Sequence, residues 1–234
     1  MSKIVVITGA TRGIGKALVE RFVDIGWRIL GLGRDEKELA LMRKNLGSKF
    51  QGFHLDITKS KDVDKIFDLF ENEHESVDLL INNAAIFKMD RFENCSFNDI
   101  DSMVDTNLKG AMYCTLRIVK FMKKRKITGR IINIASVASI HGIENQAIYC
   151  ASKYGLNGLA ESLNQELIKD NISITTIYPG GVDTPLWNNK NKYPGNIKKV
   201  LKPNDIVNLV EYISGLEPRV ILKNITIFPS NEWH

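Results

Sequence analysis

Tyr149 and Lys153 lie four residues apart and are the side chains of this chain best suited to moving a proton. Residues at positions i and i+4 of a helix share one face, about one turn apart. An ammonium group at that distance favours the phenolate, so we expect the pKa of Tyr149 to lie below the usual value of about 10. Such a tyrosine can donate and accept the proton in reactions between alcohols and carbonyl compounds.

A glycine-rich segment near the N-terminus, Thr8-Gly-Ala-Thr-Arg-Gly-Ile-Gly15, offers a place to hold a dinucleotide. It follows a β-rich run and opens a helical stripe of apolar residues, namely Ile14, Leu18, Phe22 and Ile25. In that setting glycines let the backbone approach a pyrophosphate, which then rests on the helix N-terminus. The spacing differs from G-x-G-x-x-G, so this motif alone also allows a turn that serves only packing. Together with the tyrosine and lysine, the segment predicts a nicotinamide-dependent oxidoreductase.

Short β-rich runs alternate with helical patterns, which predicts a parallel sheet with helices on both faces, an α/β fold of the Rossmann type. The seven expected strands are Lys3–Thr8, Arg28–Leu32, Phe50–Leu55, Asp78–Asn82, Arg130–Ala135, Ser173–Tyr178 and Asn224–Phe228. Further helices are expected at Asp62–Phe70, Asn98–Lys123, Tyr149–Lys169 and Asn204–Ser214. Because no repeat or linker interrupts this order, we expect residues 1–234 to form one domain.

The composition limits the possible classes of protein. Of the 234 residues, 44% are hydrophobic and 25% are charged, which is typical of a soluble globular protein. No apolar run approaches the ~20 residues of a membrane span, and because the first expected strand begins at Lys3 we expect no signal peptide. The net charge is +5, but the lysines are spread along the chain. This distribution favours a solvated surface, or attraction of an anionic cofactor or substrate, over the binding of nucleic acid.

The cysteines and histidines give no sign of a metal site. There are three cysteines without CxxC spacing, and the histidines lack the spacing of metal ligands; they are Cys95, Cys114, Cys150, His54, His74, His141 and His234. We therefore expect no metal and a reduced, cytoplasmic setting.

Over nearly its whole length the chain resembles the short-chain dehydrogenase/reductase family. The glycine segment matches that family's TGxxxGIG motif, and Asn82-Asn-Ala-Ala85 resembles its NNAG motif with alanine in place of the last glycine. Further matches are Asn107 within Thr-Asn-Leu-Lys-Gly, Ser136 after the fifth expected strand, the Tyr149/Lys153 pair, and Pro179-Gly180 with Thr184.

The resemblance implies a catalytic tetrad of Asn107, Ser136, Tyr149 and Lys153. In family members the tyrosine protonates the carbonyl oxygen while the nicotinamide delivers hydride to the carbon, and the serine polarises the same carbonyl. Lys153 would hold the ribose hydroxyls and lower the pKa of Tyr149. Asn107 would anchor a water that links Lys153 to solvent.

The same resemblance implies which residues bind the dinucleotide, with Asp56 beside the adenine ring and Tyr149 and Lys153 shared with catalysis. The other expected contacts are Gly9, Thr11, Arg12, Gly13, Ile14, Gly15, Arg34, Ile57, Asn83, Ala84, Ala85, Pro179, Gly180, Val182 and Thr184.

The end of the second expected strand predicts NADP(H) rather than NAD(H). NAD enzymes carry a carboxylate there for the ribose 2′-hydroxyl, whereas this chain has Gly33 followed by Arg34. A guanidinium can chelate a 2′-phosphate, and Arg12 is a second cation within reach. The alternative is that Arg34 is a solvated loop residue. We interpret Asp35 as a helix-capping residue and not as a ribose ligand.

The substrate is less well defined. We expect a small lid at residues 184–203 over an apolar substrate pocket. The side chains expected to line this pocket are those that follow Ser136, together with Phe87, Met89, Leu186, Trp187 and Tyr193. The alternative for Trp187 and Tyr193 is that they serve only the packing of the lid. The resemblance implies broad carbonyl reductases or 3-hydroxy acid dehydrogenases; 3-oxoacyl-acyl-carrier-protein reductases and a non-catalytic dinucleotide-binding regulator are the alternatives. It also implies a homodimer or homotetramer formed through the helices that carry Asn107 and Tyr149.

Overall fold

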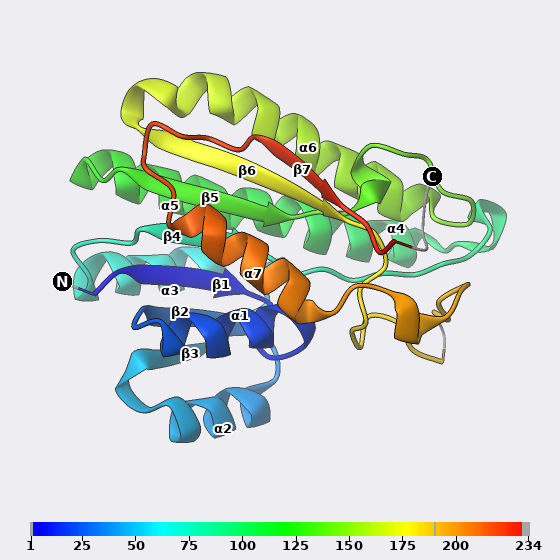
Figure 1. The fold of residues 1–234 in the computed structure, drawn as a ribbon, viewed down its shortest axis with the longest axis horizontal. Coiled ribbons are helices and arrows are strands. Elements are labelled where there is room, and N and C mark those ends of the chain that lie inside the picture. The colour runs from blue at the N-terminus through cyan, green and yellow to red at the C-terminus, as the bar shows by residue number, and fades with distance from the viewer. Residues whose placement is uncertain (1, 190, 231–234) are drawn as a thin grey trace.

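The structure, a computed structural model, describes residues 2–189 and 191–230. Within them a seven-stranded parallel sheet has the spatial order β3-β2-β1-β4-β5-β6-β7 (Figure 1). The strands are β1 (Ile4–Thr8), β2 (Arg28–Gly33), β3 (Phe50–His54), β4 (Leu79–Asn82), β5 (Gly129–Ile134), β6 (Ile172–Pro179) and β7 (Asn224–Ile227). This confirms the predicted fold. The strand order reverses between β1 and β4, and a crevice for ligands is expected at such a switch point.

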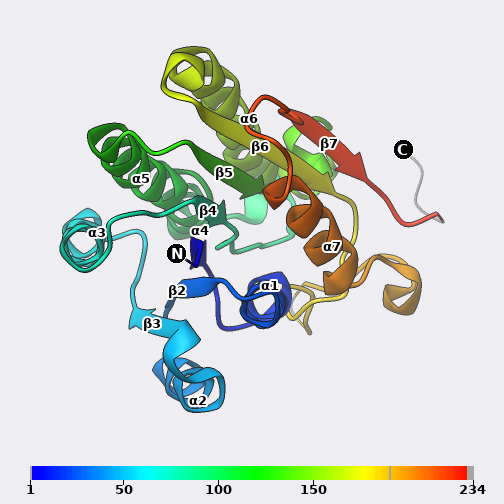
Figure 2. The same ribbon diagram turned by 60° about the vertical axis from the view of Figure 1, so that its left-hand side comes forward.

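Helices cover both faces of the sheet (Figure 2). They are α1 (Gly13–Asp24), α2 (Glu36–Leu46), α3 (Ser60–Glu73), α4 (Phe97–Val104), α5 (Ala111–Arg125), α6 (Ala147–Leu167) and α7 (Pro203–Ser214). Apolar residues of α1, α2 and α7 form one core cluster with the sheet, and those of α3, α5 and α6 form another. Alternate residues of β1 point to opposite faces, so Val5 joins the first cluster and Val6 the second.

Two helical regions differ from the sequence prediction. The capping role of Asp35 implied a helix start, but the extent of α2 was not predicted, because this helix buries little beyond Leu39 and Met42 and is otherwise charged. The single helix expected at Asn98–Lys123 is divided into α4 and α5 by a π-helical turn, Asp105–Gly110. Hydrophobic spacing does not distinguish such a turn from continuous α-helix, and π-turns often mark functional sites.

None of the helices in residues 2–189 and 191–230 combines the length and the apolar character that crossing a membrane requires.

Candidate active site

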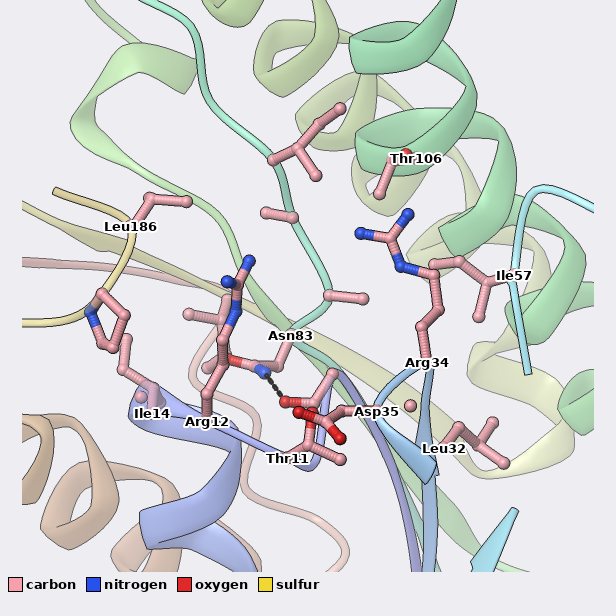
Figure 3. A pocket seen from close by; sticks show the side chains of 18 of the residues that line it. Thr11, Arg12, Ile14, Leu32, Arg34, Asp35, Ile57, Asn83, Thr106 and Leu186 are labelled. Carbon is pink, nitrogen blue, oxygen red and sulfur yellow. Dashed lines mark hydrogen bonds between the residues drawn. The ribbon is translucent and has the colours of Figure 1, made fainter. Parts of the chain in front are cut away.

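A cavity of about 620 Å³ opens at the carboxyl ends of the central strands (Figure 3). Its wall comes from the segments that follow β1 to β6 and from the start of α6. Most residues expected to bind a dinucleotide line it, namely Gly9, Thr11, Arg12, Gly13, Ile14, Arg34, Asp56, Ile57, Asn83, Ala84, Ala85, Tyr149, Lys153 and Thr184. The crevice predicted from the strand order is therefore also where the sequence motifs converge.

The glycine loop is held tightly against the segment that follows β4. Gly9 has a φ of +66°, and a Cβ on it would stand 2.9 Å from the Cα of Ala84. The hydroxyl of Thr8 accepts hydrogen bonds from the backbone N–H groups of Asn83 and Ala84, at 2.9 and 3.0 Å. The amide of Asn83 donates back to the Thr8 carbonyl at 2.9 Å. These contacts fix the loop just before α1 begins at Gly13, where the helix N-terminus favours an anion.

Gly15, which we expected to contact the cofactor, lies behind the cavity wall instead. A Cβ at this position would stand 2.1 Å from the carbonyl oxygen of Gly9 and 2.5 Å from Nδ2 of Asn83. The third glycine of the motif therefore allows α1 to pack against the loop.

Gly15→Ala is expected to lower the free energy of unfolding by about 1–3 kcal/mol, because the added methyl group overlaps backbone that cannot move freely. Denaturant unfolding measures this change. Gly158→Ala is the matched control, since Gly158 lies within α6 and a methyl group added there would meet no described atom within 4 Å. That variant is expected to gain up to about 1 kcal/mol from helix propensity. Equal effects of the two variants would contradict the packing role of Gly15.

Two arginines reach the cavity from neighbouring loops. Arg12 precedes α1 and Arg34 follows β2, and Figure 3 shows the side chains of both. A side chain at Gly33 would stand 2.8 Å from Cγ2 of Thr11, so this position has little room for a carboxylate. The carboxylate of Asp35 accepts a hydrogen bond from the backbone N–H of Glu38 at 3.0 Å, which confirms its predicted role as the cap of α2.

Tyr149, Lys153 and Ser136 are brought together beside the cavity. Tyr149 and Lys153 are 7% and 2% exposed, and the ammonium nitrogen of Lys153 lies 5.7 Å from the centroid of the tyrosine ring. That nitrogen donates a hydrogen bond to the carbonyl oxygen of Ile134 at 3.2 Å. The hydroxyl of Ser136, just after β5, lies near the phenol of Tyr149 and accepts a hydrogen bond from the N–H of Ala138 at 3.1 Å. The arrangement joins a proton donor, a second hydroxyl and an amine in one buried cluster.

The expectation of a lowered pKa for Tyr149 is wrong for this structure. Burial raises the pKa of Tyr149 to about 12, against a smaller lowering effect of the nearby Ser136 hydroxyl. Burial also lowers the pKa of Lys153 from 10.5 to about 8. The sequence argument considered only the attraction between phenolate and ammonium, whereas removing each charged group from water has the larger effect here.

Asn107 lies in the π-helical turn and is 1% exposed. Its side-chain oxygen accepts a hydrogen bond from the N–H of Ile86 at 2.8 Å, and its amide donates to the carbonyl of Ile86 at 2.9 Å and to the hydroxyl of Ser152 at 3.1 Å. The side chain thus ties the segment after β4 to α6, next to Lys153. Sequence reasoning missed this role because the partner is backbone from another element. The predicted water link stays a prediction.

The remaining expected cofactor residues, Pro179, Gly180 and Val182, lie outside the cavity lining. Pro179 ends β6, and the N–H of Gly180 donates to the carbonyl of Ile227 in β7 at 2.9 Å. Val182 is buried and forms a bridge with Leu201. These residues therefore support the segment that brings Thr184 to the cavity. Thr106, which precedes Asn107 and also lines the cavity, was not predicted from any motif.

An apolar cluster borders Tyr149. The ring of Phe87 packs edge-on against Tyr149 and Trp187, with centroid distances of 4.9 and 5.1 Å. Trp187 in turn packs against Tyr193 at 4.9 Å. Met89 and Leu186, also expected near the substrate, are half-buried against the same cluster. No group of three or more His, Cys, Asp or Glu side chains in the described part of the chain could hold a metal ion.

Comparisons with known proteins agree with this geometry. Farnesol dehydrogenase of Aedes aegypti is 30% identical over 239 residues, which cover 98% of this chain and 97% of that protein. The closed form of serine dehydrogenase complexed with NADP+ is 26% identical with a TM-score of 0.89, covering 99% of this chain and 96% of that one. A 4-hydroxyisoleucine dehydrogenase mutant complexed with NADH and succinate is 29% identical with a TM-score of 0.88, covering 96% of each chain.

The family model for short chain dehydrogenase matches residues 3–194, a span that runs from β1 through the segment after β6 and includes every residue of the cavity wall. The chain therefore belongs to the short-chain dehydrogenase family and is an oxidoreductase.

Proposed function

We propose that this protein is an NADP(H)-dependent oxidoreductase that interconverts a carbonyl group and a secondary alcohol, with Tyr149 as general acid and base. The observation that carries the proposal is the buried phenol of Tyr149, which lies near Ser136 and beside Lys153 on the wall of the cavity. A regulator that only binds a dinucleotide would need no such proton donor.

The cavity suits a dinucleotide in size and in chemistry. Its volume of about 620 Å³ lies within the usual range for cofactor sites. The glycine loop and the N-terminus of α1 suit a pyrophosphate, and Arg12 and Arg34 suit a 2′-phosphate. The similar dehydrogenases include one bound to NADP+ and one bound to NADH, so the choice of NADP(H) here depends on the two arginines.

The bound dinucleotide supplies hydride for reduction, or accepts it in oxidation. In the reductive direction Tyr149 donates its proton to the carbonyl oxygen, and burial, which raises its pKa to about 12, keeps that proton in place at neutral pH. Ser136 donates a second hydrogen bond to the same oxygen and stabilises the developing negative charge. Lys153 binds the ribose hydroxyls, and because burial lowers its pKa to about 8, its ammonium form can return a proton to the phenolate.

The substrate proposed is a modest carbonyl compound or 3-hydroxy acid, bound against the apolar cluster beside Tyr149 under a lid formed by residues 184–203. We propose that the chain acts in the cytoplasm as one catalytic domain. Assembly as a homodimer or homotetramer through α5 and α6 is supported by Met112, Leu116 and Tyr154, whose side chains are large, apolar or aromatic, and exposed.

The reaction class is tested by following NADPH oxidation against ketones, aldehydes, diketones and 3-oxoacyl thioesters, with the reverse reaction tested on 3-hydroxy acids. Turnover of small carbonyl compounds or hydroxy acids is the expected result. Thioester turnover far above all others would instead identify a 3-oxoacyl-acyl-carrier-protein reductase. Tight NADPH binding without turnover of any compound would favour the non-catalytic regulator.

Arg34→Asp is expected to reduce kcat/KM for NADPH by about 10–100-fold, because it removes a charge-assisted hydrogen bond to the 2′-phosphate and adds a repelling charge. The kcat/KM of the variant for NADH should equal or exceed that of the wild type. Parallel kinetics with both cofactors measure the preference. Arg219→Asp is the matched control, since it makes the same charge change at an exposed position between α7 and β7. Unchanged selectivity in Arg34→Asp would contradict the assignment of NADP(H) to this side chain.

A further inference from the structure

We propose that Asn191 is a positioning residue that latches the segment 184–203 onto the chain after β4 and thereby holds the Phe87 ring against Tyr149. The inference deepens the proposed function, on which its kinetic test rests. Asn191 is not part of the cavity wall and was not singled out by any motif. Its role follows from three sets of contacts in the described residues.

The first set is a pair of hydrogen bonds to backbone that is far away in sequence. The side-chain amide of Asn191 donates to the carbonyl oxygen of Phe87 at 2.8 Å, and its side-chain oxygen accepts from the N–H of Met89 at 3.0 Å. One side chain therefore satisfies the backbone on both sides of residue 88. Asn191 is only 8% exposed, so water does not readily replace these bonds.

The second set fixes Asn191 within its own segment. Its backbone N–H donates to the carbonyl oxygen of Asn188 at 3.1 Å, and its carbonyl accepts from the N–H of Asn188 at 3.0 Å. These two bonds fix the backbone of Asn191, whose side chain bonds to the backbone at Phe87 and Met89. The bond pair then connects two segments that share no strand pairing.

The third set consists of aromatic contacts that connect the segment carrying Asn191 to the catalytic residue Tyr149. Phe87 lies between Tyr149 and Trp187, at centroid distances of 4.9 and 5.1 Å, and Trp187 packs on Tyr193 at 4.9 Å. The two hydrogen bonds from Asn191 hold the backbone that carries Phe87, while Trp187 presses on its ring. Without the hydrogen bonds from Asn191, neither the backbone at Phe87 nor the contact between Phe87 and Trp187 would be fixed. The apolar surface beside Tyr149 that a substrate contacts would then lose its defined shape.

The shape of this contact requires asparagine. Alanine removes both hydrogen bonds, and aspartate replaces the donor with an oxygen that faces the carbonyl of Phe87 and repels it. Asn196 provides a matched control, because it is an exposed asparagine of the same segment whose side chain accepts a local bond from the N–H of Lys198 at 3.0 Å.

The test compares Asn191→Ala and Asn191→Asp with Asn196→Ala, using NADPH and the best carbonyl substrate of the wild type. Asn191→Ala loses both hydrogen bonds, and Asn191→Asp loses the bond to Phe87 and gains a repulsion, so each variant is expected to raise the KM of that substrate by about 10–30-fold. In both Asn191 variants kcat should stay within about 3-fold, and the Kd of NADPH within about 2-fold, of the wild-type values. A general structural defect would instead lower kcat and weaken NADPH binding together with the rise in KM. Asn196→Ala should match the wild type in the KM of the carbonyl substrate, in kcat and in the Kd of NADPH.

Amide hydrogen exchange provides a readout that does not depend on turnover. The Met89 N–H should exchange about 10-fold faster or more in Asn191→Ala, because that variant removes its acceptor. Unchanged exchange at Met89 would overturn the latch, and faster exchange with an unchanged KM would overturn its role in positioning the substrate surface. If the wild type turns over no carbonyl compound, the proposed function fails, and the exchange at Met89 alone then decides whether the latch exists.

Discussion

Tyr149→Phe is expected to lower kcat/KM for carbonyl reduction by about 10²–10⁴-fold, because the variant has no proton to give to the developing alkoxide. The ring of Phe87 packs edge-on against the ring of Tyr149, and phenylalanine at position 149 keeps this ring contact. Removing only the hydroxyl should leave NADPH binding within about 2-fold of the wild type. Steady-state kinetics and a fluorescence titration with NADPH measure the two quantities.

Tyr154→Phe is the matched control for this variant. Tyr154 lies on the same helix, one residue after Lys153, but is 46% exposed. It should keep full activity. Activity in Tyr149→Phe comparable to that of the control would mean that the proton comes from another group.

The pH dependence of the reaction follows from the raised pKa of Tyr149. Because burial raises that pKa to about 12, the phenol is protonated throughout the neutral range, and carbonyl reduction should not depend on its titration there. Alcohol oxidation needs the phenolate and should therefore accelerate as the pH rises. Initial rates in both directions across the neutral and alkaline range measure this difference.

Lys153→Met is expected to remove most activity while making the protein more stable at pH 7. Burial lowers the pKa of Lys153 to about 8, so holding the ammonium form inside the protein weakens the folded state. The ammonium group donates a hydrogen bond to the carbonyl of Ile134, and methionine has a similar length without a charge. We expect kcat/KM to fall by about 10²-fold or more, and the free energy of unfolding at pH 7 to rise by about 1 kcal/mol.

The gain in stability should depend on pH in a defined direction. Between about pH 8 and 10.5 the unfolded chain holds the lysine proton more tightly than the folded chain does, so the wild type becomes more stable relative to the variant as the pH rises. Urea unfolding at pH 7 and pH 9.5 measures the difference. Lys120→Met, at an exposed position of α5, is the control and should show no such dependence. If Lys153→Met were less stable than the wild type at pH 7, and the difference in unfolding free energy did not change with pH, the claim that a buried ammonium destabilises the folded protein would be contradicted.

The sheet was predicted well from the sequence because parallel strands are buried on both faces. All five residues of β1, for example, are buried, and Ile, Val and Thr at such positions favour strand. Gly9, Asn83 and Ser136 each follow a strand, and the carboxyl ends of these parallel strands meet at one edge of the sheet, as the sequence predicted. The capping role of Asp35 was predicted from its position alone and is confirmed.

What the sequence did not predict depends on contacts between distant segments. The raised pKa of Tyr149 follows from its burial under Phe87 and its neighbours, which no local spacing reveals. The bonds from Asn107 to Ile86 and from Asn191 to Met89 join a side chain to the backbone of another element. Such pairs carry no residue-type signal on the backbone side, so only the folded chain identifies them.

The central claim is that hydride passes from the nicotinamide to a carbonyl carbon while Tyr149 supplies the proton. Incubating the protein with NADPH that carries deuterium at the transferred position, together with a carbonyl compound that it reduces, tests this most directly. Mass spectrometry should find one deuterium on the alcohol carbon of the product formed by the wild type, and essentially none after the same time with Tyr149→Phe. Alcohol without deuterium, or equal labelled product from both proteins, would contradict the account.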